Sequence, residues 1–323
     1  MTRAGWGRLA AWVVIVALAV IAARTVDWRA AAAAARGAHA GWLLVAVAAN
    51  ASILFFATLE WRQFFPRGAT LSLRETFPIV ALTSSVANGA PAIAGYATAV
   101  HLLATRGRLG HAAGLSVKLL DGLAEIIVKL GLLIAAALVV PGFGGPGLGV
   151  ALGLIALTGA LAVGLSVGRG TLAAWLDRCA EATGSRAWTF AATTVHQLDA
   201  LDRPGRFAGG VALGVAKKVA EGCAIAAAAH ALGVGLPGWA VVAALLAVNL
   251  ASFVAVAPGN LGAYEAGAFL AFRAAGVDPA SALALALIQH AAYLIPVAGT
   301  GWLLEGARMV RQRREKSMED AGG

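Results

Sequence analysis

The chain has 323 residues, of which 60% are hydrophobic and only 13% are charged, and its mean hydropathy is +0.79. A soluble chain usually carries about a quarter charged residues, so these figures exclude the soluble classes and indicate an integral membrane protein. The net charge of +9 agrees with an excess of Lys and Arg in cytoplasmic loops, and no nucleic-acid partner is expected. The cysteines Cys179 and Cys223 predict neither a disulfide framework nor a metal cluster.

The first half of the chain begins with two apolar runs, residues 9–23 and 41–59, which predict two spans with a helix at the outer surface between them. The next stretch, residues 75–105, is interrupted in its middle. Each half would form about 20 Å of helix, too short to cross a hydrocarbon core of about 30 Å. The break residues are Asn88, Gly89, Pro91 and Gly95. We expect a re-entrant helical hairpin here.

The middle of the chain predicts two further spans, residues 112–140 and 148–167, joined by a Pro/Gly turn without charge. The charged segment 169–206 follows, and Leu172, Trp175, Leu176 and Cys179 fall on one helical face of it. This pattern predicts an amphipathic helix on the cytoplasmic membrane surface. Residues 207–233 predict another span.

A second broken stretch covers residues 239–275, followed by a last span at 279–304 and a basic tail at 305–323. Its break residues are Pro258, Gly259, Asn260 and Gly262. In both breaks the proline suits the first turn of the second half-helix, and the glycines permit a tight reversal and a close approach. The alternative is an ordinary span with a Pro/Gly kink.

The distribution of Lys and Arg chooses between these arrangements. If every segment crosses the membrane, the basic residues divide nearly evenly between the two sides, whereas two re-entrant hairpins place most of them on one side. The positive-inside rule favours the second arrangement. We therefore expect one all-α domain over residues 1–323, with six full spans, two re-entrant hairpins in a possible inverted repeat, and both termini cytoplasmic. Trp61 and Trp302 are expected at the inner interface.

Four ionisable residues follow one stripe of the span at 112–140: Lys118, Asp121, Glu125 and Lys129. Each charge facing lipid at the membrane centre would cost about 2.5–3.5 kcal/mol, so the stripe must face protein or water. One interpretation is a polar cavity for a substrate. The other is an internally neutralised ladder that locks helices together, with Lys118 bonded to Asp121 and Glu125 bonded to Lys129.

The span at 207–233 adds Lys217, Lys218 and Glu221. Glu221 is expected to pair with Lys217 one turn away, which leaves Lys218 as an unneutralised cation. An anionic partner, either Glu265 or a ligand phosphate, would explain it. His290 lies in the last span, where an isolated histidine most often bonds one helix to another.

Motifs for catalysis and cofactor binding are absent: there is no P-loop, no Gly-x-Ser-x-Gly elbow and no His/Cys metal spacing. We expect no catalytic residue, no metal and no cofactor. A half-helix that begins inside the membrane presents unpaired N–H groups and a partial positive charge, which attract anions such as phosphate.

Residues 257–265, APGNLGAYE, and the Gly-Val pair at 276–277 resemble the signature of the lysylphosphatidylglycerol synthase transmembrane-region family, also called flippase-like. Residues 60–62, 91–95 and 117–121 fall where this family has its Arg-Trp, Pro-Gly-x-x-Gly-Glu and Arg-x-x-Asp motifs. Carried over by position, Asp121 and Glu265 match motif acids, Lys118 replaces an Arg, and Pro258, Gly259 and Gly262 match the hairpin.

The resemblance spans nearly the whole chain and implies movement of a lipid or lipid-linked anion between leaflets of the bacterial cytoplasmic (inner) membrane. Three departures imply weakened or altered headgroup recognition: Tyr96 in place of Glu, His101 near a place where Arg is common, and His290 where the last helix often carries Arg. No synthase domain accompanies the spans in this sequence, so aminoacyl transfer is not expected.

The favoured interpretation is a transporter, not an enzyme, for an anionic phospholipid or a polyprenyl- or hopanoid-type lipid. The hairpin tips would meet near the midplane, lysines would neutralise the phosphate, and the acids would hold the lysines or carry protons. One alternative is a non-transporting scaffold for a lipid or glycan biosynthetic complex. Another is an intramembrane enzyme that uses Asp121 and Glu125 as acid and base. A homodimer or a biosynthetic protein partner is left open.

Overall fold

The computed structural model describes residues 28–90, 92–252 and 258–322, and every regular element in these ranges is helical. The expected span at 9–23 and Pro91 lie outside them. Three helices of the described part are long and apolar enough to cross a membrane. They are α3 (Ala40–Gln63), α6 (His111–Val139) and α12 (Pro279–Gly322), the last over residues 279–315. The predicted all-α membrane fold is confirmed.

The first broken stretch forms α4 (Leu73–Gly89) and α5 (Ala92–Thr105), which pack against each other. A capping box starts α4: the Ser72 N–H donates to the Glu75 carboxylate at 2.8 Å, and the Glu75 N–H donates to the Ser72 hydroxyl at 3.3 Å. A Cβ on Gly95 would lie 2.6 Å from the Cβ of Ala87, so glycine permits the close approach of the two helices.

The second broken stretch forms α10 (Gly238–Ala251) and α11 (Ala263–Ala274), which also pack against each other. Between them lies the short turn η3 (Pro258–Asn260). Gly259, Asn260 and Gly262 have φ values of 68°, 56° and 87°, in the left-handed region that ends a helix.

One prediction about this break is wrong. Pro258 was placed in the first turn of the second half-helix, but α11 begins at Ala263, after its N-cap Gly262. The left-handed residues between Pro258 and Ala263 cause the difference, because they prevent a helix from continuing through them.

The middle of the chain differs from the prediction in its continuity. The span at 148–167 and the expected amphipathic helix belong to one helix, α7 (Pro146–Thr183), which ends at Gly184 in the left-handed conformation. No proline interrupts these residues, so the helix continues through the charged boundary at Arg169. α8 (Arg186–His196) packs against α7, and the turn η1 (Asp199–Asp202) leads into α9 (Pro204–Ala231).

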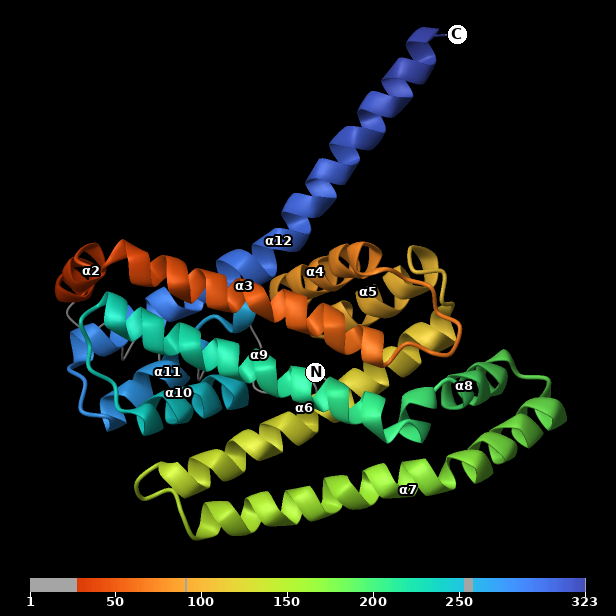
Figure 1. Ribbon diagram of the computed structural model, residues 1–323, viewed down its shortest axis with the longest axis horizontal. Coiled ribbons are helices and arrows are strands. Elements are labelled where there is room, and N and C mark those ends of the chain that lie inside the picture. Colours follow the sequence, from red (N-terminus) through yellow and green to blue (C-terminus); the bar gives the residue numbers. More distant parts are fainter. Residues whose placement is uncertain (1–27, 91, 253–257, 323) are drawn as a thin grey trace, which may run out of the picture.

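The last span and the basic tail likewise form one helix. The Asp278 carboxylate accepts hydrogen bonds from the N–H groups of Ala280 and Ser281 at 3.1 and 3.0 Å and caps the start of α12. The far end of α12 projects out of the helical body (Figure 1). The short helix α2 (Trp28–Arg36) packs near α12.

Two sets of four helices make reciprocal contacts (Figure 1). The order α3, α4, α5, α6 corresponds to the order α9, α10, α11, α12, and each set has a packed pair of short helices between two long ones. α3 packs along α9, α4 packs against α12, and α6 packs against α10. Each set therefore supplies part of the wall around the same interior.

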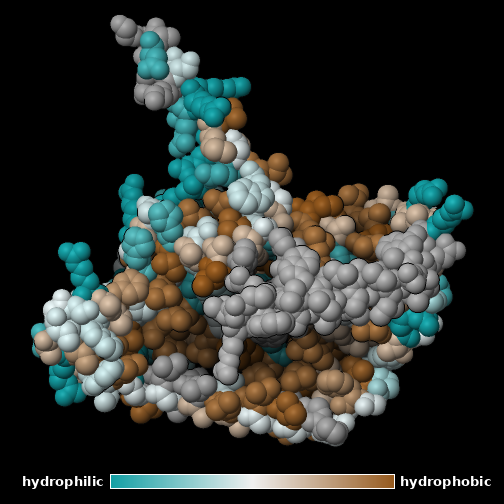
Figure 2. All heavy atoms as spheres, turned by 180° about the vertical axis from the view of Figure 1, so that it is seen from behind, coloured by the Kyte–Doolittle hydropathy of each residue, from teal (hydrophilic) through white to brown (hydrophobic). Residues whose placement is uncertain are grey.

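Apolar side chains cover much of the face shown in Figure 2, while hydrophilic ones gather on the projecting part of α12 and at the ends of the molecule. Leu44, Val167, Val219 and Ile295 are among the exposed apolar residues. Continuous apolar surface of this kind is unusual for a protein in water and is typical of one solvated by lipid.

Candidate functional site

A cavity of about 290 Å³ lies between α3, α4, α6, α9, α10 and α12. We call it the polar cavity. Its charged lining residues are Lys118, Asp121, Glu125, Lys129, Lys217, Lys218 and Glu221. The charged stripe of α6 thus faces protein and cavity, as its desolvation cost requires. The two remaining predicted site residues, Glu265 and His290, are not part of this lining.

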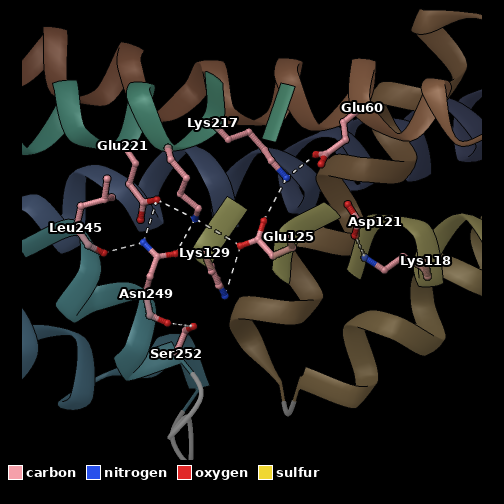
Figure 3. A network of polar contacts seen from close by, with 11 residues as sticks. Glu60, Lys118, Asp121, Glu125, Lys129, Lys217, Glu221, Leu245, Asn249 and Ser252 are labelled. Atoms are coloured by element: carbon pink, nitrogen blue, oxygen red, sulfur yellow. Dashed lines mark hydrogen bonds and ion pairs between the residues drawn. The ribbon is translucent and has the colours of Figure 1, made fainter. Parts of the chain in front are cut away.

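Glu125 lies where three lysines from two helices converge (Figure 3). Its carboxylate is 3.4 Å from the amino group of Lys129, 3.6 Å from that of Lys217 and 3.5 Å from that of Lys218. The Glu125 side chain is 30% exposed, whereas the side chains of Lys217 and Lys218 are largely covered. Glu125 therefore joins α6 to α9 while its carboxylate still reaches the cavity.

The two neighbouring lysines of α9 point to different helices. Lys217 forms an ion pair with Glu60 of α3, whose side chain is fully buried. Lys218 is 3.0 Å from the Glu221 carboxylate and donates to the side-chain oxygen of Asn249 at 2.7 Å. Asn249 in turn donates to the Leu245 carbonyl at 2.8 Å. The lysines therefore fix α9 to α3 on one side and to α10 on the other.

A second group of contacts surrounds Lys118. Its amino group is paired with Asp121, and the Trp61 indole N–H donates to the same carboxylate at 3.1 Å. The amino group also lies 4.9 Å from the ring centroid of Trp61 and 4.7 Å from that of Tyr96, within the range of cation–π attraction. Two aromatic rings and one carboxylate therefore hold this cation.

Among the described residues, this network contains four lysines and four carboxylates. The lysines are Lys118, Lys129, Lys217 and Lys218, and the acids are Glu60, Asp121, Glu125 and Glu221. Their formal charges cancel, which lowers the cost of holding them away from water. Both pairs of the ladder interpretation occur, Lys118 with Asp121 and Lys129 with Glu125, but they line a cavity.

Both helix breaks reach the polar cavity. Asn88, near the end of α4, and Asn260, in η3, are lining residues. A Cβ built on Gly259 would lie 3.5 Å from the carbonyl oxygen of Asn88, so the two breaks touch. A Cβ on Gly89 would meet no atom of the described residues within 4 Å.

Glu265 caps the start of α11 and contacts α12. One of its carboxylate oxygens accepts from the Gly262 N–H at 2.7 Å, and the other is 2.8 Å from Nδ1 of His290. The His290 ring stacks on Tyr264 with centroids 4.0 Å apart and is buried. This carboxylate therefore occupies the N-terminus of α11, where an anion was expected to bind. The helix-to-helix bond predicted for His290 is present.

Comparison with protein families matches residues 8–301 to the lysylphosphatidylglycerol synthase TM region. The chain belongs to this family. No curated protein and no solved structure matches it. The family and the apolar helices identify a membrane protein with a lipid-related function.

The family motifs lie on different sides of the site. The Lys118 and Asp121 motif pair lines the polar cavity, and Tyr96, which replaces the family's acid, offers Lys118 an aromatic face instead of a second negative charge. The acid of the second motif, Glu265, lies between α11 and α12 with His290. Tyr96 and His290, two of the departures named above, therefore each contact a residue that the resemblance assigns to a motif.

The pairing predicted for α9 is wrong. Glu221 pairs with Lys218 and not with Lys217, so Lys218 is not an unneutralised cation. Glu265, proposed as the partner of Lys218, pairs with His290. The prediction for Glu221 considered only ion-pair partners on the same helix, whereas the carboxylate that pairs with Lys217 is Glu60 of α3. Trp61 is also not interfacial, because it is buried against Asp121.

Two members of the network were missed from the sequence. Glu60 was assigned to a turn beyond the membrane, but α3 continues to Gln63 and carries it into the buried interior. Asn249 is an isolated polar residue in the apolar helix α10. Asn249 could have been recognised from the sequence, because a lone amide in a membrane helix needs a hydrogen-bonding partner. Glu60 could not, because its burial depends on where α3 ends, and the expected span ended at residue 59.

Proposed function

We propose that this chain is a transporter, without enzymatic activity, that moves a lipid with a phosphate-bearing headgroup between the leaflets of the bacterial cytoplasmic membrane. The observation that carries the proposal is the polar cavity, where paired lysines and carboxylates meet both helix breaks. Intramembrane charges of this kind usually mark a substrate pathway. An anionic phospholipid or a lipid-linked phosphate has the matching chemistry.

The network favours a site in which partners exchange. Lys217 and Lys218 each contact Glu125 at 3.5–3.6 Å, longer than the 3.0 Å contact between Lys218 and Glu221. A phosphate entering the cavity could replace Glu125 at these lysines, because phosphate oxygens accept the same charge-assisted hydrogen bonds. When the lipid leaves, Glu125 neutralises the lysines again.

The reciprocal packing of the two helix sets supports an inverted repeat. The counterparts α3 and α9 pack on each other, and α4 with α12 mirrors α10 with α6. Repeats of opposite orientation with broken helices at the shared site are the usual plan of alternating-access carriers. We propose that the hairpins rock against the long helices around the polar cavity.

Two groups of contacts support a re-entrant first hairpin with its basic loops on one side. The loops before α4 and after α5 line one small cavity, residues 68–71 and 106–109, so this hairpin begins and ends at the same level. At that end Arg206 donates to the Arg62 carbonyl at 2.6 Å. At the other end the His39 N–H donates to the Ala231 carbonyl at 2.7 Å. The basic loops thus share one side.

The enzyme alternative has less support from the geometry. The side chains that it would use, Asp121 and Glu125, each have a lysine as ion-pair partner. This arrangement positions charge and does not leave a carboxyl group free to transfer a proton. The scaffold alternative requires only that the helices pack, so it predicts tolerance of substitutions in the cavity.

The test is Glu125→Gln in proteoliposomes that contain headgroup-labelled phosphatidylglycerol. The amide preserves the shape of the side chain but no longer neutralises the lysines, so the phosphate should be held longer. We expect the rate of leaflet exchange to fall about tenfold or more, equivalent to about 1.4 kcal/mol of barrier, while binding of the lipid is retained. The matched control is Glu181→Gln on α7, where the side chain is exposed.

Each result decides between the proposals. Normal exchange by Glu125→Gln protein that is folded and monodisperse would contradict the transport site. Equal exchange in vesicles with and without wild-type protein would contradict the transporter and favour the scaffold. Chemical change of the lipid, read by mass spectrometry, would favour the enzyme.

A further inference from the structure

A second cavity, of about 560 Å³, lies beside the polar cavity between α6, α9 and α10. We call it the apolar groove, formed by residues 127–135 of α6, 211–222 of α9 and 241–245 of α10. Its lining includes Val128 and Gly131 of α6, Val215 and Val219 of α9, and Val241 of α10. Lys218 is the only charged lining residue that the described part of the chain contributes.

Lys218 belongs to both cavities. Its amino group is bonded to Glu221 and Asn249, which line the polar cavity but not the apolar groove. Lysine commonly divides its environment in this way, with the methylene stem against apolar surface and the ammonium group in a polar region. The inner end of the groove is therefore continuous with the charged site.

The groove is open toward the membrane. Val215 and Val219 are 47% and 60% exposed, on a surface that lipid solvates. A Cβ on Gly131 would meet no atom of the described residues within 4 Å. Gly222 also lines the groove, and its nearest neighbours would be Leu245 and Val241 at 3.8 Å. The two glycines keep the groove wide on two of its walls.

We propose that the apolar groove holds an acyl chain of the phospholipid whose phosphate-bearing headgroup enters the polar cavity at Lys218. The groove opens onto acyl chains, so hydrocarbon burial alone gives little preference for one lipid. The ionic contact at Lys218 selects the lipid, and the groove keeps its chain in the bilayer while the headgroup is inside the protein. The identity of the headgroup rests on the proposed function, whereas the position of the chain rests on the groove.

The experiment uses the full chain in nanodiscs that contain phosphatidylglycerol with a photoactivatable diazirine on one acyl chain. After irradiation, mass spectrometry locates the modified residues. We expect modification concentrated on residues 127–135, 211–222 and 241–245. Modification spread evenly over the exposed apolar residues of every helix would overturn the inference.

A pair of glycine variants makes the test specific. Gly131→Leu fills the groove at a position where the new Cβ meets no atom of the described chain, and leucine favours the helix more than glycine does. The control Gly159→Leu adds the same side chain to α7, at a position where a Cβ also meets no described atom but which lies outside the groove. The leucine side chain excludes the acyl chain sterically, so labelling of the groove should fall about tenfold in Gly131→Leu only.

Two further arms separate the possible failures. Polyprenyl phosphate with a photoactivatable isoprenoid tail is offered in parallel, and preferential labelling of the groove by this lipid would overturn the assignment to an acyl chain. Leaflet exchange is measured on the same proteins. If the wild type exchanges lipid and Gly131→Leu is labelled as strongly as the wild type, the assignment of the groove is wrong and the proposed function stands. If the groove is labelled but no exchange occurs, the assignment of the groove stands and the proposed function is wrong.

Discussion

The buried charges of this protein are arranged so that each lysine has a carboxylate on its own helix or on the helix beside it. Lys217 is the clearest case, because its partner Glu60 is fully buried on α3. Such a pair adds little stability over an apolar replacement, but the loss of one partner leaves an uncompensated charge. The network therefore makes the positions of α3, α6 and α9 depend on one another.

This dependence predicts the effect of Glu60→Gln. Removing the carboxylate leaves Lys217 with only the longer contact to Glu125, and we expect a loss of about 3–5 kcal/mol, as for other buried pairs broken on one side. The double variant Glu60→Gln with Lys217→Met removes both charges and should recover most of the loss. Thermal unfolding in detergent measures both. An unchanged melting temperature in the single variant would contradict the pairing, and Glu315→Gln on the exposed end of α12 is the control.

At the scale of the elements, the hairpins depend on small residues where their two helices cross. Gly95 of α5 meets Ala87 of α4, and Gly267 of α11 would place a Cβ 3.1 Å from the Ala247 carbonyl oxygen of α10. α9 uses the same device against α3 and α6. A Cβ on Gly214 would lie 2.8 Å from Val128 of α6 and 3.3 Å from the Glu60 carboxylate of α3, and one on Gly210 would overlap the Phe64 ring. These two glycines therefore serve helix packing.

We therefore predict that Gly95→Ala destabilises the first hairpin. Two effects oppose each other: alanine favours a helix over glycine by about 1 kcal/mol, whereas overpacking costs typically 1–3 kcal/mol. The added Cβ would lie 3.0 Å from backbone as well as near Ala87, so the clash should outweigh the gain. The melting temperature should fall in Gly95→Ala, and the swap with Ala87→Gly should restore it. Gly89→Ala, whose Cβ meets nothing within 4 Å, is the control; an equal fall there would contradict the packing argument.

The sequence predicted these elements unevenly, and the reason is physical. The helices and the positions of both breaks follow from local patterns, since apolar runs, prolines and left-handed glycines act within a few residues. The partner of each charged side chain does not follow from local patterns, because Lys217 and Lys218 are adjacent in sequence yet point to α3 and α10.

The continuity of α7 past Arg169 was also missed, because a charge at a membrane boundary does not end a helix. Spacing alone is also no guide to packing: Gly149 and Gly153, and Gly164 and Gly168, are four residues apart on α7, yet a Cβ at these positions meets no atom of the described chain.

At the scale of the whole molecule, one ion pair joins the loop after α5 to the far part of α12. Arg106 donates to both carboxylate oxygens of Glu305 at 2.7 Å, and this hydrogen bonding holds the pKa of Glu305 below its ordinary value. Because the pKa of Glu305 is lower in the folded state, the ion pair stabilises the folded protein at pH values above the ordinary pKa of about 4.3. This contribution is lost as the pH falls through the lowered pKa. The pair therefore stabilises the protein at neutral pH.

The corresponding prediction concerns Glu305→Gln. Its melting temperature should lie below that of the wild type at about pH 7, and the difference should shrink as the pH falls through the lowered pKa of Glu305, where the wild-type carboxylate becomes protonated. The control Glu181→Gln should show no such convergence, since its side chain is exposed. A difference that is constant across this pH range would mean that the carboxylate does not act through its charge.

The same contact bears on the topology, because it places the loop after α5 beside the segment that follows the last span. If α4 and α5 form a re-entrant hairpin, single cysteines at Thr70 and Thr105 must lie on one side of the membrane, together with one at Arg186, the first residue of α8. Cysteines at Gly235 and Ala274, which flank α10 and α11, must lie on the other side. All five positions are exposed, and the background replaces Cys179 and Cys223.

A membrane-impermeant maleimide applied to oriented vesicles separates these sets. We expect the first three cysteines to react only from the cytoplasmic side, where the positive-inside rule places the basic loops, and the other two only from outside. Reaction of Thr70→Cys and Thr105→Cys from opposite sides would show that α4 and α5 together cross the bilayer. Reaction of Gly235→Cys and Ala274→Cys from opposite sides would show the same for α10 and α11. With α6, α7, α9 and α12 as full spans, that second result would place Arg106 and Glu305 on opposite faces of the membrane, which their 2.7 Å hydrogen bonds do not allow. The ion pair and the accessibility pattern therefore test the same arrangement by independent means.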